Sequence, residues 1–322
     1  MRDTTWQTSS IPQTSAAPHD SAARSEPRRR AAVRPWRASR ATGFLFILPA
    51  FLLFLIFLWI PIIKGFIYSF FDVDFVKGNR FVGLANYQEI LSNPDVKTAV
   101  RNTLYYMALC LAIGYWVPCL FAIAVSELRR FQSFARVAAY LPNVIPAVVL
   151  YGIWMWLYDP VGPFNAFLKT VGLKPISFLT DPDWSMVSIV LMETWQQFGA
   201  AMLIYLAGIL AVPKDLYEAA EIDGAGVWAR IRHITLPAIR HLLLLMLILQ
   251  LIATSQAYLS QQALLDGGPN NATMTYTLLS VKYAFSRFDF GAASALGVLM
   301  FVVLSGLAFL HYRLSEKERD AG

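Results

Sequence analysis

The sequence predicts an all-α membrane protein that crosses the bilayer six times. Its 322 residues are 57% hydrophobic and only 15% charged, against roughly 25% charged residues in a soluble domain. Uncharged stretches long enough to cross about 30 Å of hydrocarbon recur along the chain. The alternating pattern of a membrane β-barrel strand does not occur in the sequence, which favours helices.

Six apolar stretches between flanking charges give the predicted spans. Each exceeds the roughly 18 residues that mark a candidate transmembrane helix. Between the flanking charges the six stretches hold a single charged side chain, Glu193 in the fourth. The spans are expected at approximately residues 43–63, 102–126, 137–158, 184–212, 237–262 and 290–312.

Lysine and arginine set the predicted orientation through the positive-inside rule. With both termini in the cytoplasm, the inner segments hold 18 of the 27 Lys and Arg residues and the outer segments hold 9. Residues 1–40, rich in Ser, Ala, Pro and Arg, are expected to form a disordered basic cytoplasmic tail that lies on anionic lipid. Residues 316–322 are expected to form a second cytoplasmic tail.

One polar segment, residues 213–236, lies between two of the most apolar stretches of the chain. Pro213 suits the first turn of a helix, and Asp215 and Glu218 place negative charge near the positive end of its dipole. Gly224 suits a left-handed helix end, and a second short helix is expected after it. The small residues around this glycine offer a knob that another protein could approach closely. An ordinary amphipathic loop at the membrane surface is the alternative.

The stretch EAAEIDGAGVWARIRHITLP resembles the EAA loop of the permease subunits of ABC importers. That pattern runs E-A-A, three residues, G, nine residues, I-x-L-P, and residues 218–237 match it. In that family the loop is a coupling helix that docks in a cleft of the cytoplasmic ATPase. Many members have a further proline where this chain has His241. The coupling residues that the resemblance implies are Glu218, Ala219, Ala220, Asp223, Gly224, Ala225, Ile231, Leu236 and Pro237.

The resemblance covers roughly residues 41–315, which form the expected permease domain. GLANYQEIL at 83–91 and LYDPVGPFNAFL at 157–168 are similar to the carbohydrate branch of maltose and glycerol-phosphate permeases. The resemblance implies a bacterial inner-membrane protein that works by alternating access. Its implied partners are a second homologous permease, two cytoplasmic ATPase subunits and an extracytoplasmic binding protein.

Polar residues within the spans predict the substrate pathway, because they are costly in hydrocarbon. Glu193 and Gln197 lie one helical turn apart, and Gln250, Thr254 and Tyr258 repeat every four residues. Amides, hydroxyls and aromatic rings pair with sugar hydroxyls and sugar faces, so these residues suit a sugar. Together with the resemblance to carbohydrate permeases, they lead us to expect a di- or oligosaccharide. Hydrogen bonds between helices are the alternative role for these residues. The candidate pathway residues are Glu193, Gln197, Thr254, Gln256 and Tyr258, to which the resemblance adds Trp195.

The resemblance also carries the small residues Ala200, Ala253 and Ala257 onto the pathway, so the sugar contacts here are expected to differ from those of relatives. A pathway-facing Glu193 would disfavour a phosphorylated sugar, because like charges repel at low dielectric. A permease for a non-sugar solute such as a glycerol phosphate stays open as an alternative. A secondary active transporter also stays open, although Glu193 alone supplies few of the ionisable groups that it would need.

The sequence contains no chemistry-bearing motif that would make the chain an enzyme. It has no G-x-x-x-x-G-K-[ST] phosphate loop, no H-E-x-x-H and no Cys/His metal cluster. We therefore expect ATP hydrolysis on partner chains, no cofactor, no metal and no nucleic-acid partner.

Overall fold

The computed structural model describes residues 40–128 and 131–320 and divides into two compact units, residues 1–53 and 54–322. In the first unit the described residues belong to α1 (Arg40–Phe54), whose last residue opens the second unit. The side chains of α1 from Phe44 onward are exposed. The rest of the predicted basic tail, residues 1–39, lies outside the described residues.

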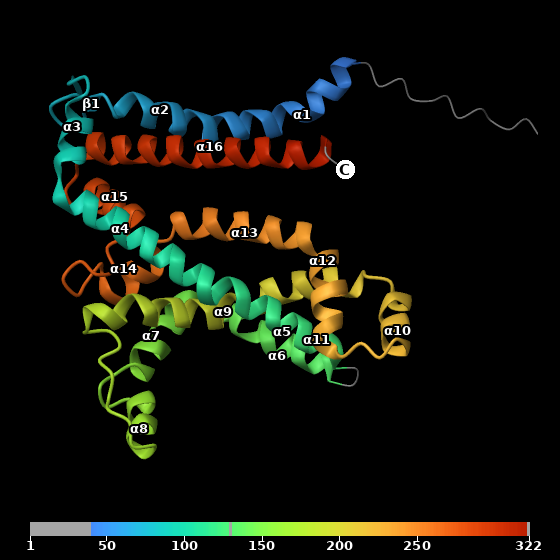
Figure 1. Cartoon of the computed structure of the whole chain (residues 1–322). Coiled ribbons are helices and arrows are strands. Elements are labelled where there is room, and N and C mark those ends of the chain that lie inside the picture. The colour runs from blue at the N-terminus through green and yellow to red at the C-terminus, as the bar shows by residue number, and fades with distance from the viewer. Residues whose placement is uncertain (1–39, 129–130, 321–322) are drawn as a thin grey trace, which may run out of the picture. The chain divides into compact units, whose positions relative to one another are not determined.

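In the described part of the second unit, the regular secondary structure is helical apart from one hairpin (Figure 1). This agrees with the all-α class that the sequence predicts. The hairpin is antiparallel and consists of β1 (Phe71–Asp72) and β2 (Arg80–Phe81). The helices and π-helical turns (η) of this unit are η1 (Leu55–Trp59), α2 (Ile60–Tyr68), α3 (Ala85–Ser92), α4 (Pro94–Leu109), η2 (Cys110–Tyr115), α5 (Trp116–Glu127), α6 (Gln132–Val144), α7 (Ala147–Leu157), α8 (Pro163–Thr170), α9 (Pro182–Leu210), α10 (Lys214–Ile222), α11 (Val227–Arg230), η3 (Ile231–Thr235), α12 (Leu236–Ala238), α13 (Arg240–Ser255), α14 (Leu259–Leu265), α15 (Tyr276–Phe285) and α16 (Phe290–Asp320).

Three helical stretches among the described residues are long and apolar enough to cross a membrane. They are Phe44–Tyr68, Pro94–Glu127 and Pro182–Leu210, and they coincide with the first, second and fourth predicted spans. Up to five stretches qualify if each bent helix pair is counted as one span, so the number six stays a prediction. The sixth predicted span lies in α16, whose apolar part is Phe290–Gly306 and whose helix continues to Asp320 through the predicted tail.

The third predicted span, residues 137–158, is wrong as a single helix. It consists of α6 and α7, whose axes differ in direction by 96°. The break lies at Ile145, which is extended with φ −69° and ψ 127°. A proline disfavours helical backbone in the residue before it, and Pro146 follows directly. Pro146 is therefore the sequence signal for this break.

The fifth predicted span, residues 237–262, is also wrong as a single helix. The stretch 227–238 and α13 differ in direction by 70°, and α13 ends at Ser255, before α14 begins. Beyond this end, the Thr275 and Thr277 hydroxyls donate to the carbonyls of Ala257 and Ser255 at 3.0 and 3.1 Å. These hydroxyls satisfy carbonyls that a continuous helix would have paired, as a break at membrane depth requires.

The connection between α14 and α16 packs against α4. The side-chain amide of Asn102 donates to the carbonyls of Asn271 and Met274 at 2.6 and 3.1 Å. The Thr103 hydroxyl accepts a hydrogen bond from the backbone N–H of Tyr276 at 2.8 Å. Residues of α4, α15 and α16 share one buried apolar cluster. The start of the second span and this connection therefore form one packed region.

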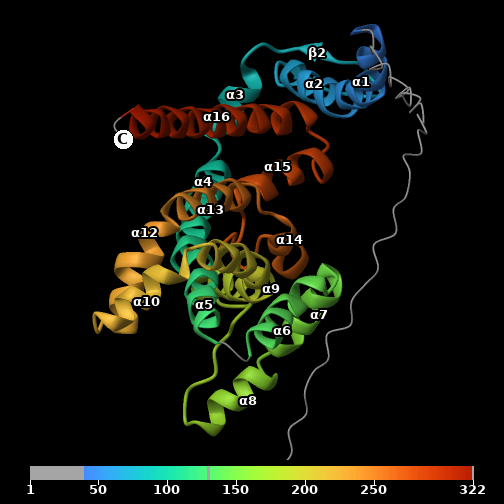
Figure 2. The same ribbon diagram turned by 90° about the vertical axis from the view of Figure 1, so that its right-hand side faces the viewer.

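Helix α9 lies at the centre of the second unit, with α5 and α6 packed along it (Figure 2). Buried side chains of all three helices, among them Met202 and Leu206 of α9, form one apolar cluster. Gly199 lets α6 approach closely, since a Cβ there would lie 2.0 Å from the carbonyl oxygen of Ala139. Elsewhere in the unit, α2 and α16 lie side by side in both views.

Gly199→Val is expected to destabilise the protein by about 1–3 kcal/mol, because its side chain would overlap the backbone of α6. Thermal unfolding of the detergent-solubilised protein measures the loss. Gly297→Val is the matched control, since a Cβ at Gly297 meets no atom within 4 Å. Equal unfolding temperatures for the two variants would contradict the close approach of α6 to α9.

Candidate functional site

The segment between α9 and α13 forms two short helices joined by a sharp turn. The first helix, α10, ends at Ile222, and Gly224 follows with a φ of +77°. Glycine adopts this left-handed conformation without the steric penalty of a Cβ. The second helix runs from Val227 through η3 and α12. The predicted helix end at Gly224 is confirmed, while Pro213 precedes α10 as its cap residue and lies outside the first turn.

The nine predicted coupling residues divide into an exposed set and a set that packs inward. Glu218, Ala219, Asp223, Gly224 and Pro237 are exposed, and Ala220, Ala225, Ile231 and Leu236 are half-buried. Ile231 and Leu236 pack against the apolar cluster of α5, α6 and α9. These two side chains therefore seat the loop on the long helices and do not form a free surface.

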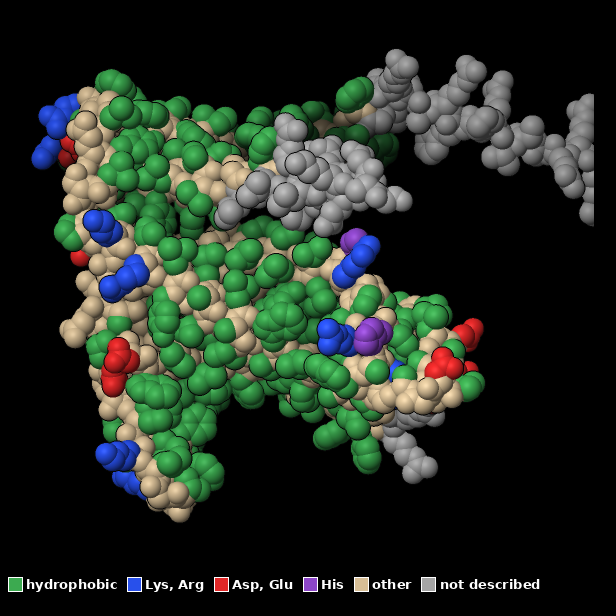
Figure 3. Space-filling model, viewed as in Figure 1, with side chains coloured by type: hydrophobic (Ala, Val, Ile, Leu, Met, Phe, Trp, Pro, Cys, Tyr) green, Lys and Arg blue, Asp and Glu red, His purple; other side chains and the backbone are tan. Residues whose placement is uncertain are grey.

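The free surface of the loop includes apolar side chains that sequence reasoning missed. Ile222 is 87% exposed and Trp228 is 71% exposed, one on each short helix. Figure 3 shows acidic side chains gathered at the end of the projection that α10 forms. Ile222 and Trp228 therefore belong, with these acidic groups, to the exposed face of the loop.

A cavity of about 450 Å³ lies between α4, η2, α9, α13 and the start of α14. The π-helical turn η2 borders it with Cys110 and Gly114. Gly114 packs between α9 and α13, since a Cβ there would lie in ordinary contact with the Thr194 hydroxyl at 3.4 Å and the Gln250 amide nitrogen at 3.5 Å. The polar groups that line the cavity belong to Tyr106, Asn143, Tyr151, Glu193, Thr194, Gln197, Gln250, Thr254, Gln256, Tyr258 and Ser260.

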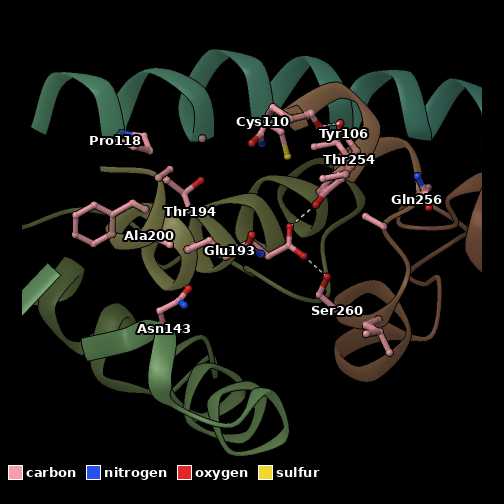
Figure 4. A pocket seen from close by; sticks show the side chains of 18 of the residues that line it. Tyr106, Cys110, Pro118, Asn143, Glu193, Thr194, Ala200, Thr254, Gln256 and Ser260 are labelled. Carbon is pink, nitrogen blue, oxygen red and sulfur yellow. Dashed lines mark hydrogen bonds between the residues drawn. The ribbon is translucent and has the colours of Figure 1, made fainter. Parts of the chain in front are cut away.

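Glu193 joins three helices at this cavity. Its carboxylate accepts hydrogen bonds from the Tyr106 hydroxyl of α4 and from the Ser260 hydroxyl of α14. Figure 4 shows the three side chains turned toward one another. Sequence reasoning identified Glu193 as a lone charge but missed its two donors, which lie 87 and 67 positions away along the chain.

The structure brings five of the six predicted pathway residues to the cavity, from three different segments. Glu193 and Gln197 come from α9, Thr254 from α13, and Gln256 and Tyr258 from the non-helical residues that follow. The four-residue spacing predicted that Tyr258 shares a helix face with Thr254. This is wrong, because α13 ends at Ser255. The carried-over positions Ala200, Ala253 and Ala257 also line the cavity.

Trp195 does not line the cavity. It is 42% exposed, and its ring packs against that of Trp154 with centroids 5.6 Å apart. Its neighbour Thr194 lines the cavity in its place, because adjacent helical residues point in directions about 100° apart.

Some polar groups of the cavity already have hydrogen-bond partners within the protein, and others do not. The Thr254 hydroxyl donates to the Gln250 carbonyl of its own helix at 2.8 Å, and Thr254 is buried. Gln197 is exposed to the cavity, and its amide has no hydrogen-bond partner among the described residues. An unpaired amide both donates and accepts, so Gln197 has capacity for a polar solute.

A second cavity, of about 680 Å³, lies at the hairpin, α3 and the start of α16. Asp74 borders it, and the backbone N–H groups of Lys77 and Val76 donate to its carboxylate, which lowers the pKa of Asp74 below its ordinary value. Within residues 40–128 and 131–320, no group of three or more His, Cys, Asp or Glu side chains is arranged to hold a metal ion.

Residues 114–320, which include α9, the two short helices and α13, match the family described as "Binding-protein-dependent transport system inner membrane component". The chain belongs to this family. It is 30% identical over 280 residues to the trehalose/maltose transport system permease protein MalF of Thermococcus litoralis, covering 86% of this chain and 95% of the relative. It is 33% identical over 315 residues to the diacetylchitobiose uptake system permease protein NgcF of Streptomyces coelicolor, covering 91% and 89%.

A solved structure has the same fold. A chain of the bacterial alginate ABC transporter, in complex with alginate pentasaccharide-bound periplasmic protein, superposes with a TM-score of 0.78 at 25% identity. The match covers 88% of this chain and 98% of that chain. The present chain is thus a multi-pass membrane permease of an ABC importer that depends on a binding protein. Members of its family are generally non-catalytic permease subunits.

Tyr106→Phe is expected to destabilise the protein by about 1–3 kcal/mol, because it removes one of the two hydroxyl donors to the Glu193 carboxylate. Thermal unfolding in detergent measures the effect. Tyr105→Phe, at the exposed neighbouring tyrosine, is the control. In a Glu193→Gln background the loss should be smaller, since interacting residues are not additive. An equal loss in both backgrounds would show that the two groups do not interact.

Proposed function

We propose that the solute of this importer is a carbohydrate of the size of a di- or oligosaccharide. The observation that carries the proposal is the cavity lining, in which amides, hydroxyls and tyrosine rings surround one carboxylate. Such groups pair with sugar hydroxyls and pack on sugar rings, and a few placed polar groups fix a ligand's orientation. The relatives named for trehalose and maltose and for diacetylchitobiose support the same substrate class.

The charge of the cavity favours an uncharged sugar. Among the described residues, no Lys, Arg or His lines the cavity, and Glu193 is its one acidic residue. A phosphorylated solute would find no cationic partner in the described lining, and an ionised Glu193 would repel it at low dielectric. We therefore favour a neutral sugar over a glycerol phosphate as the solute.

We assign the other steps of import to partner chains. The sequence has no phosphate-binding loop motif, so ATP hydrolysis belongs to two cytoplasmic ATPase subunits and this chain performs no catalytic step. The extracytoplasmic binding protein delivers the sugar, and a second homologous permease completes the pathway. Alternating access then results when ATP-driven closure of the ATPases moves the loop 213–236 and the helices attached to it.

We propose six spans with both termini in the cytoplasm. The excess of Lys and Arg in the inner segments supports this orientation. The loop 213–236 then faces the ATPases, and the hairpin with α3 faces the binding protein. In the second unit these two parts lie at opposite ends of the stretch formed by α4, η2 and α5 (Figure 1).

Uptake by the assembled importer tests the substrate class. The chain is reconstituted in liposomes with its partner permease, ATPases and binding protein, and uptake of labelled maltose, trehalose, longer oligosaccharides and glycerol 3-phosphate is compared. ATP-dependent uptake of a neutral sugar is expected. Uptake of glycerol 3-phosphate in preference to every sugar would overturn the proposal.

Gly224→Val should abolish ATPase binding, because the left-handed turn at Gly224 is strained for any residue with a Cβ. Nothing lies within 4 Å of a Cβ at this position, so the effect is conformational and involves no clash. Glu218→Lys should act similarly through charge at the exposed docking face. The measurement is pull-down of the ATPase at equal membrane levels of permease. Gly226→Val is the control, as Gly226 has an ordinary φ of −68°.

Gln197→Leu should reduce sugar uptake by about ten-fold, because an unpaired amide at the cavity is lost. Thr254→Val should change uptake much less, since the Thr254 hydroxyl is bonded within its own helix. Both variants are expected to assemble with the ATPases at the parent level. Equal uptake by the parent and Gln197→Leu would move Gln197 from the pathway to a structural role.

A further inference from the structure

Arg230 lies where three parts of the second unit meet. It is the last residue of α11, and its side chain is only 11% exposed. One terminal nitrogen pairs with the carboxylate of Glu221 on α10, and the other lies 3.6 Å from the carboxylate of Glu127, the last residue of α5. Its buried Nε has no hydrogen-bond partner among the described residues. Two carboxylates from different helices therefore hold this guanidinium.

The pair between Arg230 and Glu221 closes the loop 213–236 on itself. A second link lies nearby, where the hydroxyls of Tyr217 and Thr235 share a hydrogen bond of 3.0 Å. Each link joins α10 to the second short helix, and the first is charge-assisted, which makes it the stronger kind. With the turn at Gly224 as the third connection, the two helices are held as one body.

The pair between Arg230 and Glu127 joins this body to the second span. Beside it, Ile231 and Leu236 pack against the apolar cluster that includes Ala122, Ile123 and Val125 of α5. The covalent link to α13, by contrast, bends by 70°. Ile239, at this bend, is buried in the same apolar cluster, so the loop is packed against α5 as well as joined to α13.

We propose that Arg230 is a positioning residue that passes movement of the loop 213–236 to α5. The inference rests on the proposed docking of this loop with the ATPase. The stretch Pro94–Glu127 is continuous helix, so a displacement of its end reaches its middle without an intervening loop. The middle of this stretch lines the cavity through Tyr106, Cys110, Gly114 and Pro118. Movement at the ATPase therefore reaches the solute through the second span as well as through α13.

Glu127→Gln tests the inference, because it removes the charge on α5 and leaves the pair inside the loop intact. In the complete importer in liposomes, with loaded binding protein, three quantities are measured: ATPase retained on purification, ATP hydrolysis and sugar uptake. ATPase retention should equal that of the parent and ATP hydrolysis should continue. Sugar transported per ATP hydrolysed should fall roughly five-fold or more, the usual range for coupling between two sites.

Two further variants make the result specific. Glu127→Asp keeps the carboxylate and should recover most of the coupling ratio. Arg232→Gln removes a guanidinium from the same helix, but Arg232 is exposed and belongs to none of the ion pairs between described residues, so its ratio should match the parent's. A loss in Glu127→Gln that Glu127→Asp does not recover would overturn the inference.

Other outcomes separate this inference from the proposed function. An unchanged transport ratio in Glu127→Gln would show that the pair does not carry the movement. Loss of the ATPase from Glu127→Gln would show that the pair shapes the docking surface, which also overturns the inference. If the proposed docking itself is wrong, Gly224→Val keeps its ATPase and its uptake, whatever Glu127→Gln does.

Discussion

A peptide group in hydrocarbon has no water to bind, so each N–H and C=O there must find its partner inside the protein. This constraint governs where α13 stops and what its end is used for. The carbonyls released beyond Ser255 accept hydrogen bonds from Thr275 and Thr277, two hydroxyls of a distant connection. With the backbone satisfied in this way, Gln256 and Tyr258 leave the helical path and line the cavity, as does Ser260 at the start of α14. The cavity thus depends on a helix end that another part of the chain completes.

One side of helix α9 packs against α6, and another side lines the cavity. A glycine, Gly199, lets the backbone of α6 come close and anchors the bent third segment. Glu193, Thr194 and Gln197 instead face the cavity, where hydroxyls from α4 and α14 meet the carboxylate. Gly199 allows tight packing against α6, and the polar residues just before it line the cavity. The cavity therefore lies beside the close contact between α6 and α9.

The sequence predicted those features that depend on local chemistry. Charge-free length gave the helical stretches, and the glycine rule placed the turn at Gly224. The break in the third span was missed, although Pro146 is a local signal for it. The break after Ser255 could not be predicted, because the hydroxyls that pair with its free carbonyls lie 18 and 22 positions away along the chain. The sequence identified Glu193 as an isolated acidic residue. Its donors Tyr106 and Ser260 could not be identified, because they lie far away along the chain.

The surroundings of Arg230 also could not be predicted from the sequence. In a polar loop an arginine is most often solvated, and nothing in its local sequence indicates otherwise. Its burial and its two carboxylate partners follow only from how α5, α10 and α11 pack together. Long-range ion pairs of this kind depend on tertiary structure, so no local sequence pattern predicts them.

The stretch Pro94–Glu127 contains 34 residues, a rise of about 50 Å. Near its first turn Asp95 lies 3.5 Å from Arg287, and at its last residue Glu127 meets Arg230. If partners bind at both ends, as proposed, thermodynamic reciprocity applies along this stretch: a partner that favours one tilt of the helix at one end alters the affinity at the other end by the same factor as the reverse. In the proposed orientation these two ion pairs lie on opposite sides of the membrane, and the π-helical turn η2 lies between them.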